Sequence, residues 1–464
     1  MGGLMTQFNF SLDDPSYLLL HKIGILGLTK VLAYCDRLNL LQPSDISFSV
    51  HPRKLAVNWQ CPDNVAFSIL RNAAYQINNG LIDSPALELS DEERYFFSQG
   101  LLTTFFQHNT HRRFTGEPRE LSFLVEDDKP PITPVIRPIT ECCYTQDIPK
   151  LFSKNGAFSP YITIKSHNFP GMIENETNPK KNLESIDKFL LLFFLPLVAP
   201  IVSLSSDLLG ARRGLVLIEP YNLVIQKQHK TPRQFKQSIY SSYGDALLSF
   251  LANETIDIHQ LNIELYILGT QQWNTKQRFI KKKVVRPKIK EDSLEMFKYF
   301  AQLLPTTVHV SPQKAFVSPS SLLGFIADNL IQKKQWHHNL GQFLLSNTYY
   351  EKKTLLSMIQ SHGSIDYQKS LNYWQSLWQS YLFSKKIKYK NLYYHSIKTK
   401  AFYLLQSAKN QNAFIRNLLC LFPLSINESF FINKQWELVK DEIIQAIFLY
   451  NLPKSIKSET YEKE

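Results

Sequence analysis

The stretch from Asp14 to Trp59 reads DPSYLLLHKIGILGLTKVLAYCDRLNLLQPSDISFSVHPRKLAVNW and contains both kinds of element that decide the fold. Asp14 and Pro15 supply an N-cap acceptor and a first-turn proline, which predict the start of a long helix. Apolar residues then alternate over 46–50 and 55–59 on either side of HPRK, which is the pattern of a β-hairpin. Helix and sheet are therefore mixed from the start of the chain.

Two glycines interrupt the predicted helix. Gly24 and Gly27 each cost about 1 kcal/mol relative to alanine in a helix interior, so we expect another backbone to approach closely there. Farther along, Ser90 and Glu93 form a capping box that predicts a second helix, reaching about Gln107. Strands are predicted near Phe123, at 162–164, 215–218, 223–225 and 263–268.

The character of the chain changes at Ser318. Ser318 and Pro319 again provide an N-cap and a first-turn proline, and apolar residues recur at helical spacing from there on. The fold class is therefore α+β, with a mixed α/β domain over 1–317 and a basic C-terminal helical bundle over 318–464. Residues 321–464 hold 18 Lys plus Arg against 10 Asp plus Glu, so a net +8 of the chain's +12 lies in the bundle.

Composition limits the class of protein. With 464 residues and 44% hydrophobic content, the chain is expected to form two or three globular domains. Its five cysteines form no CxxC pair, which disfavours a disulfide framework or a zinc site and favours a reducing cytoplasm. The apolar run Phe189–Leu204 is shorter than the roughly 20 residues that span a bilayer and contains two prolines, so we expect a buried core segment and no membrane partner.

Two basic tracts predict a polyanion partner. The segment from Lys276 to Lys290, KQRFIKKKVVRPKIK, has eight Lys or Arg in fifteen residues and no acid. A second, KKIKYKNLYYHSIKTK from Lys385 to Lys400, interleaves lysines with tyrosines on which unpaired bases could stack. The candidate binding residues are Lys276, Arg278, Lys281, Lys282, Lys283, Lys385, Lys386, Lys388, Tyr389, Lys390, Tyr393 and Tyr394. The alternative for either tract is a solvated strand or helix face that keeps a basic protein soluble.

Shorter polar segments supply further candidates. One loop offers amide and guanidinium donors suited to base edges or phosphates. A second, over 166–182, is long, polar and without periodicity. Arg212 and Arg213 precede a predicted strand and could equally pair with acidic neighbours. The remaining candidates are His108, Asn109, His111, Arg112 and Arg113 in the first loop and Asn168, Lys180 and Lys181 in the second.

Motifs for catalysis are sparse. The chain has no GxxxxGK[ST] phosphate loop, no GxSxG elbow and no cysteine-protease signature. His108 and His111 are spaced HxxH but lack a close acidic ligand, and the pair His337–His338 beside Trp336 favours a packing role. We therefore expect a binding protein without cofactor or metal. A metal-dependent nuclease or nucleic-acid-modifying enzyme with a dispersed site and a stand-alone nucleic-acid or membrane scaffold are the alternatives.

Two short motifs carry a family resemblance. The segment His21–Leu28, HKIGILGL, resembles the HKxGxxGL opening of the large subunits of type I CRISPR Cascade complexes, the Cas-eight family, particularly its MYXAN or subtype I-B group. The segment Gly210–Gly214, GARRG, leads into the strand LVLIEP and is similar to a second landmark of that group. Family members combine an irregular α/β N-terminal domain with a C-terminal helical bundle, which agrees with the domain organisation expected above.

The resemblance implies a non-catalytic role in RNA-guided antiviral DNA binding. Large subunits of this family read a protospacer-adjacent motif (PAM) in double-stranded DNA, help to open the duplex and hold the displaced strand of the R-loop, while guide RNA pairs with the other strand. The implied protein partners are the backbone, cap and small subunits of Cascade and a downstream nuclease-helicase or transposition adaptor.

Overall fold

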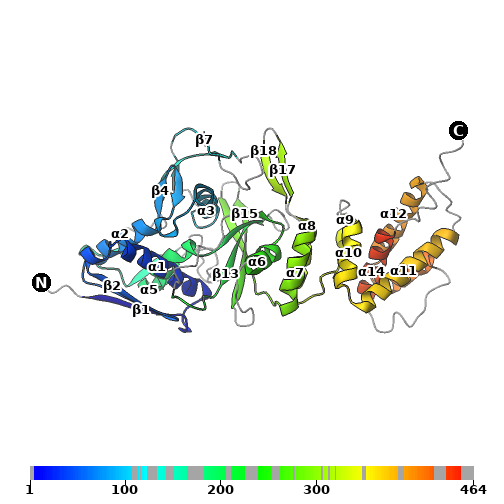
Figure 1. The fold of residues 1–464 in the computed structure, drawn as a ribbon, viewed down its shortest axis with the longest axis horizontal. Coiled ribbons are helices and arrows are strands. Elements are labelled where there is room, and N and C mark those ends of the chain that lie inside the picture. The colour runs from blue at the N-terminus through cyan, green and yellow to red at the C-terminus, as the bar shows by residue number, and fades with distance from the viewer. Residues whose placement is uncertain are drawn as a thin grey trace. The chain divides into compact units, whose positions relative to one another are not determined.

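The computed structural model describes residues 5–106, 112–114, 116–122, 133–142, 151–164, 182–204, 211–224, 239–252, 262–274, 277–304, 307–311, 314–318, 320–346, 352–384, 391–422 and 435–450. The chain divides into two compact units, the first ending at Lys333 and the second beginning at Lys334. Mixed helices and strands followed by a helical C-terminal region confirm the predicted α+β class (Figure 1).

The first unit combines helices with several small sheets and one larger sheet. Its strands are β1 (Thr6–Ser11), β2 (Ile46–His51), β3 (Lys54–Trp59), β4 (Gln76–Asn78), β5 (Leu81–Asp83), β6 (Arg112–Phe114), β7 (Arg119–Glu120), β8 (Val135–Ile136), β9 (Ile139–Cys142), β10 (Tyr161–Ile164), β11 (Asn182–Ser185), β12 (Ile201–Leu204), β13 (Ala211–Ile218), β14 (Ile239–Tyr240), β15 (Ile263–Asn274), β16 (Gln277–Val285), β17 (Thr307–Ser311) and β18 (Lys314–Ser318). Its helices are α1 (Leu19–Arg37), α2 (Asp63–Ala74), α3 (Asp91–Thr103), α5 (Ile186–Phe194), α6 (Tyr243–Ala252), α7 (Glu291–Leu303) and α8 (Ser321–Leu330), with short 3₁₀ turns η1 (Gln42–Ser44), η2 (Pro85–Leu87) and η5 (Leu195–Leu197).

The predicted hairpin forms as expected. Strands β2 and β3 pair antiparallel, and β1 adds to the other side of β3, giving the order β1-β3-β2. Inward residues of this sheet, including Phe10 and Trp59, are buried in the core that also contains α1, α2, α3 and α5. The capping box of α3 is also present, because the Ser90 side chain accepts from the backbone N–H of Glu93.

Helices α1 and α5 lie side by side at the centre of this core (Figure 1). The close backbone approach predicted from the glycines is confirmed. A Cβ atom on Gly24 would lie 2.0 Å from the Leu191 carbonyl oxygen, and one on Gly27 would lie 2.2 Å from that of Phe194. The apolar run Phe189–Leu204 supplies the partner helix and is buried as predicted.

A five-stranded sheet with the order β14-β12-β13-β15-β16 forms the other half of the first unit. Its pairs are antiparallel except β12–β14, which is parallel. Helix α1 contacts β13, and α6 contacts β13 and β15, so the sheet joins the N-terminal core to the helices that follow it. Among the described strands, β16 pairs only with β15 and stands at the edge of this sheet.

Three predicted boundaries are wrong. Helix α1 begins at Leu19 instead of Asp14, because the Asp14 carboxylate accepts the N–H of Ser16 in a turn at 2.8 Å. No strand forms at residues 223–224, where the N–H of Leu223 donates to the Pro52 carbonyl at 2.8 Å, and residue 225 lies outside the described part. Ser318 ends β18, and the N-cap of the next helix is Ser320, whose hydroxyl accepts from Leu323.

The boundary between the units also differs from the predicted one. Helix α8 was assigned to the bundle, but it packs on α6 and α7 of the first unit. The Asp328 carboxylate accepts from the Ser242 hydroxyl at 2.8 Å and from the N–H of Gly244 at 2.9 Å. These contacts bind α8 to the N-terminal end of α6, and the division comes after Lys333 instead of before Ser318.

The second unit is helical throughout its described residues. Its helices are α9 (Leu340–Ser346), α10 (Lys352–His362), α11 (Ile365–Ser384), α12 (Asn391–Ser407), α13 (Gln411–Leu421) and α14 (Trp436–Leu449). Trp374 and Trp378 of α11 are fully buried and pack with α14 in the centre. The predicted packing role of His337 is confirmed by its stacking on Tyr367, with ring centroids 3.5 Å apart.

Candidate nucleic-acid interface

The first basic tract lies mainly on an edge strand. Backbone register pairs Lys281, Lys282 and Lys283 of β16 with Gly269, Leu268 and Ile267 of β15. The tract then leaves the sheet through Arg286, whose Nε donates to the Glu264 carboxylate at 2.9 Å. Arg278 lies on the same strand, and Lys276 falls outside the described residues. From 277 to 285 the tract therefore lies along the sheet edge.

The GARRG segment, which carries the second motif of the family resemblance, contributes residues to the same sheet as this tract. We predicted that Arg212 and Arg213 precede a strand, but they lie within β13. Arg213 pairs with Leu268, which in turn pairs with Lys282, so the three residues form one row across β13, β15 and β16. With strands about 4.8 Å apart, the backbones of Arg213 and Lys282 are about 10 Å apart. Two candidate segments 69 positions apart in sequence are thus brought together.

The first candidate loop is only partly described. His108, Asn109 and His111 lie outside the described residues, as do Asn168, Lys180 and Lys181 of the second loop. Arg112 and Arg113 form β6, which pairs with β9. The Arg113 guanidinium lies 3.3 Å from the Glu141 carboxylate, and both side chains are exposed. Such exposed ion pairs contribute about 0–1 kcal/mol to stability. This pair therefore does not prevent the Arg113 guanidinium from binding a phosphate in place of the Glu141 carboxylate.

The second basic tract falls between two helices of the bundle. Lys385, Lys386, Lys388, Tyr389 and Lys390 lie outside the described residues, between α11 and α12. Tyr393 and Tyr394 belong to the first turn of α12.

Tyr394 is partly exposed at the start of α12. Its hydroxyl is buried beside Trp378, and burial raises the pKa of this tyrosine above its ordinary value. Farther along α12, the Lys398 ammonium lies over the rings of Phe402 and Phe448, 5.5 and 4.9 Å from their centroids. In the described part of this tract, Tyr394 and Lys398 therefore contact the bundle, whereas Lys400 is exposed.

The HKIGILGL motif is accounted for by packing and polar contacts inside the first unit. The N–H of Leu18 donates to Nδ1 of buried His21 at 3.1 Å, which requires a neutral ring, and burial lowers the His21 pKa to about 4. The Lys22 ammonium lies 2.9 Å from the Glu219 carboxylate, and both side chains are less than one-fifth exposed. Together with Gly24 and Gly27 at the α5 contact, every named position of the motif has a structural role.

Sequence reasoning missed one cationic surface. From Tyr367 to Asn427 the chain contains no Asp or Glu, but it contains nine Lys or Arg. This acid-free segment runs from α11 through α13, and the exposed residues within it include Lys400, Tyr403 and Arg416. A search for local basic clusters does not find it, because the signal is an absence of carboxylates over a long segment.

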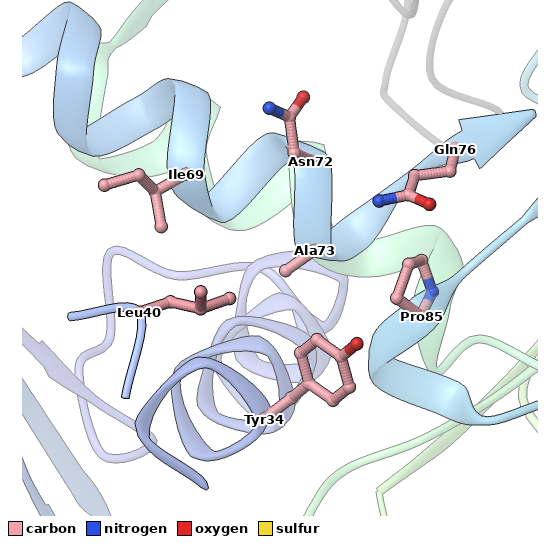
Figure 2. A pocket seen from close by; sticks show the side chains of 7 residues that line it. All are labelled: Tyr34, Leu40, Ile69, Asn72, Ala73, Gln76 and Pro85. Carbon is pink, nitrogen blue, oxygen red and sulfur yellow. The ribbon is translucent and has the colours of Figure 1, made fainter. Parts of the chain in front are cut away.

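A cavity of about 240 Å³ lies elsewhere, in the first unit, between the C-terminal ends of α1 and α2 and the turn η2. Figure 2 shows Tyr34, Leu40 and the Gln76 carboxamide directed toward it, while the amide of Asn72 points away. Its remaining lining residues are Ile69, Ala73 and Pro85. No cation lines this cavity, so it does not match a polyanion.

The described residues also bear on metal sites and membrane spans. In the described ranges, no group of three or more His, Cys, Asp or Glu side chains is placed to hold a metal ion. The HxxH pair His108 and His111 lies outside these ranges. None of the described helices is both long and apolar enough to cross a membrane.

Part of the chain matches a known family model. Residues 9–193 match the family model of the DevT N-terminal domain. The matched region begins in β1, contains the α1 motif and ends within α5, so it includes both helices of the central glycine-mediated contact. No match was found among curated proteins.

Proposed function

We propose that this chain is the large subunit of a type I CRISPR Cascade complex and binds target DNA under the direction of a guide RNA. The DevT N-terminal domain match indicates, in general terms, a CRISPR-associated protein similar to the Cas-eight subunits. The HKIGILGL motif resembles the opening of that family, and it lies inside the matched region. Both signals come from the first unit.

The proposed role divides between the two units. The first unit reads the PAM in duplex DNA, with Arg112, Arg113 and the row from Arg213 to Lys282 as candidate phosphate or base contacts. The second unit holds the displaced strand. Guide RNA supplies the sequence reading through base pairing, as in other RNA-guided effectors. The protein then recruits a nuclease-helicase or a transposition adaptor and itself performs no turnover.

The observation that carries the proposal is the distribution of charge. Between Tyr367 and Asn427 the sequence carries nine cations and no carboxylate, which supports a net positive field around this segment. Such a field attracts phosphates, and the counterions that they release make binding dependent on salt. A DNA-holding subunit needs this field; a protein scaffold without nucleic acid does not.

Reconstitution tests the proposal. The chain is combined with guide RNA and with the backbone and cap subunits of a type I Cascade complex, and binding to duplexes with or without a complementary target is measured by mobility shift. We expect tight, guide-dependent binding only with the chain present. Target binding of equal strength without the chain, or sequence-selective binding by the isolated chain, would contradict the proposal.

The enzymatic alternative has its own test. Purified chain is incubated with single-stranded and duplex DNA in Mg²⁺ or Mn²⁺. We expect intact DNA. Cleavage that disappears in His108→Ala would instead establish the nuclease and identify the HxxH segment as part of its site.

A further inference from the structure

The helices α12 and α13 expose both cations and apolar side chains, with Lys400 and Tyr403 on α12 and Ile415, Arg416 and Leu419 on α13. The inward residues Leu405 of α12 and Phe414 and Leu418 of α13 are buried. Asn417 of α13 donates to the Leu404 carbonyl at 2.7 Å and to the Ser407 hydroxyl at 3.2 Å, which holds the two helices side by side. Exposed residues of both helices therefore lie on the opposite side of the pair.

Tyr403 is the largest side chain on this face. It is 72% exposed, whereas Tyr394, nine positions earlier on the same helix, has its hydroxyl buried. A hollow of about 430 Å³ lies beside it, lined by Thr399, Lys400 and Leu404 as well as Tyr403 itself. An exposed aromatic ring next to a hollow offers a planar partner both a stacking surface and space.

One cation lies beside the ring on α12, and a second lies on the neighbouring helix α13. Lys400 is three positions before Tyr403 on α12, so the two side chains are neighbours on the helix surface. Arg416 precedes Asn417 on the exposed side of α13, and its Nε donates weakly to the Asn412 carbonyl at 3.4 Å. Neither cation forms an ion pair with a described residue, and the acid-free segment around them supplies no carboxylate. Their charges are therefore available to an external anion.

We propose that this face binds unpaired nucleic acid, with one base stacked on Tyr403 and adjacent phosphates bound by Lys400 and Arg416. The inference rests on the proposed function and makes it specific, because it assigns the strand contact to α12 and α13 instead of to the tyrosines at 389–394. An unpaired base exposes the face that an aromatic ring needs, whereas bases in a duplex are already stacked on their neighbours. The ring accepts any base, so binding is independent of sequence.

A variant series on the full-length chain tests the assignment. Affinity for a fluorescent 20-nucleotide single strand and for the matching duplex is measured by anisotropy at fixed salt. Tyr403→Ala is expected to weaken single-strand binding about 5- to 150-fold, the equivalent of one base–aromatic stack, and to leave duplex binding unchanged. Tyr403→Phe keeps the ring and should remain within about twofold of the wild type. Tyr221→Ala removes a 71% exposed ring from the first unit and serves as the matched control.

Folding does not confound this series, because substitution of so exposed a residue changes stability by only about 0.5 kcal/mol. Equal single-strand affinity for wild type and Tyr403→Ala would overturn the inference, as would an equal loss for Tyr221→Ala or for the duplex. That last pattern would indicate general electrostatic binding or a protein contact on this face. Failure of the reconstituted complex to depend on the chain would overturn the proposed function, and the oligonucleotide assay would still decide the role of Tyr403.

Discussion

His21 illustrates how much a single buried side chain can contribute to stability and how little it needs to contribute to function. It lies beside Tyr17, with ring centroids 5.8 Å apart, and the Tyr17 hydroxyl donates to Asp187 at 3.1 Å. Burial is the main cause of its lowered pKa, and the nearby Lys188 lowers it further. The ring is therefore held neutral at the start of α1, where it accepts a backbone N–H.

The lowered pKa predicts acid sensitivity. Between pH 6.5 and about 4 the unfolded chain binds a proton at His21 that the folded chain does not, so stability is present above this window and is lost as the pH falls through it. Between pH 7 and pH 5, we expect the free energy of unfolding to fall by about 2 kcal/mol less in His21→Gln than in the wild type. Urea unfolding at both pH values measures it. An unchanged pH dependence in His21→Gln would refute the assignment.

At the scale of single residues, the sequence predicted the burial of some positions but not of others. The glycines three apart correctly indicated a close contact between backbones. The direction of a given tyrosine on α12 could not be predicted, because consecutive residues differ by about 100° around a helix and only the packed neighbours decide which one points inward. Tyr394 and Tyr403 have similar local sequences rich in Lys and apolar residues, yet the first meets Trp378 and the second meets solvent.

At the scale of elements, the α1–α5 contact determines how the first unit is built. Helix α5 is buried on nearly every side, so its position is set by how closely α1 can approach. The absence of Cβ atoms at two positions of α1 lets backbone meet backbone there. Interiors are close-packed, so little room exists for either helix to move apart.

Adding one methyl group tests this contact. Gly24→Ala should improve intrinsic helix propensity by about 1 kcal/mol, but its Cβ meets a backbone carbonyl that cannot rotate away. We expect a net loss of about 1–3 kcal/mol in the free energy of unfolding, the usual range for overpacking. Urea denaturation followed by circular dichroism measures it. Asp36→Ala, at an exposed position of the same helix, is the matched control and should stay within about 0.5 kcal/mol, and an equally mild effect of Gly24→Ala would contradict the packing role.

It was easier to predict which helices and strands form than to predict where they begin and end. Alternation gave the β2–β3 hairpin, and a reciprocal Ser–Glu pair gave the start of α3. The boundary near Ser318 was missed because two candidate N-caps, Ser318 and Ser320, lie two residues apart, and pairing of β17 with β18 decides between them. The assignment of α8 depended on the Asp328 contacts with α6, which join residues more than 80 positions apart and leave no local signal.

At the scale of the whole molecule, positive charge is spread over both units but organised differently in each. In the first unit it follows an edge strand and meets Arg213 through the sheet register. In the second it covers a long acid-free segment. Lysines on an edge strand also discourage unwanted strand pairing, so the two surfaces need separate tests.

Charge reversal separates the two roles of the edge strand. In a chain with Lys281, Lys282 and Lys283 all changed to Glu, DNA binding should depend less on salt. The slope of log binding constant against log salt concentration should become shallower by about 0.9 for each duplex phosphate contact removed, or by about 0.7 for single strands. Titrations from low to moderate salt measure the slope. Lys333→Glu with Lys334→Glu changes two exposed lysines outside both tracts and is the control. If the triple variant has the wild-type slope, the edge lysines serve solubility alone.

The pairing of α1 with α5 has a consequence for how such chains diversify. The two helices are separated by about 150 positions of sequence but meet at two glycines, so the surface loops between them can lengthen or shorten at a modest entropic cost, roughly 0.6 kcal/mol for each doubling of loop length. Homologues should therefore vary most in the length of these loops. A search that requires the glycine-containing helix and its apolar partner helix, and allows any number of residues between them, should recover these homologues.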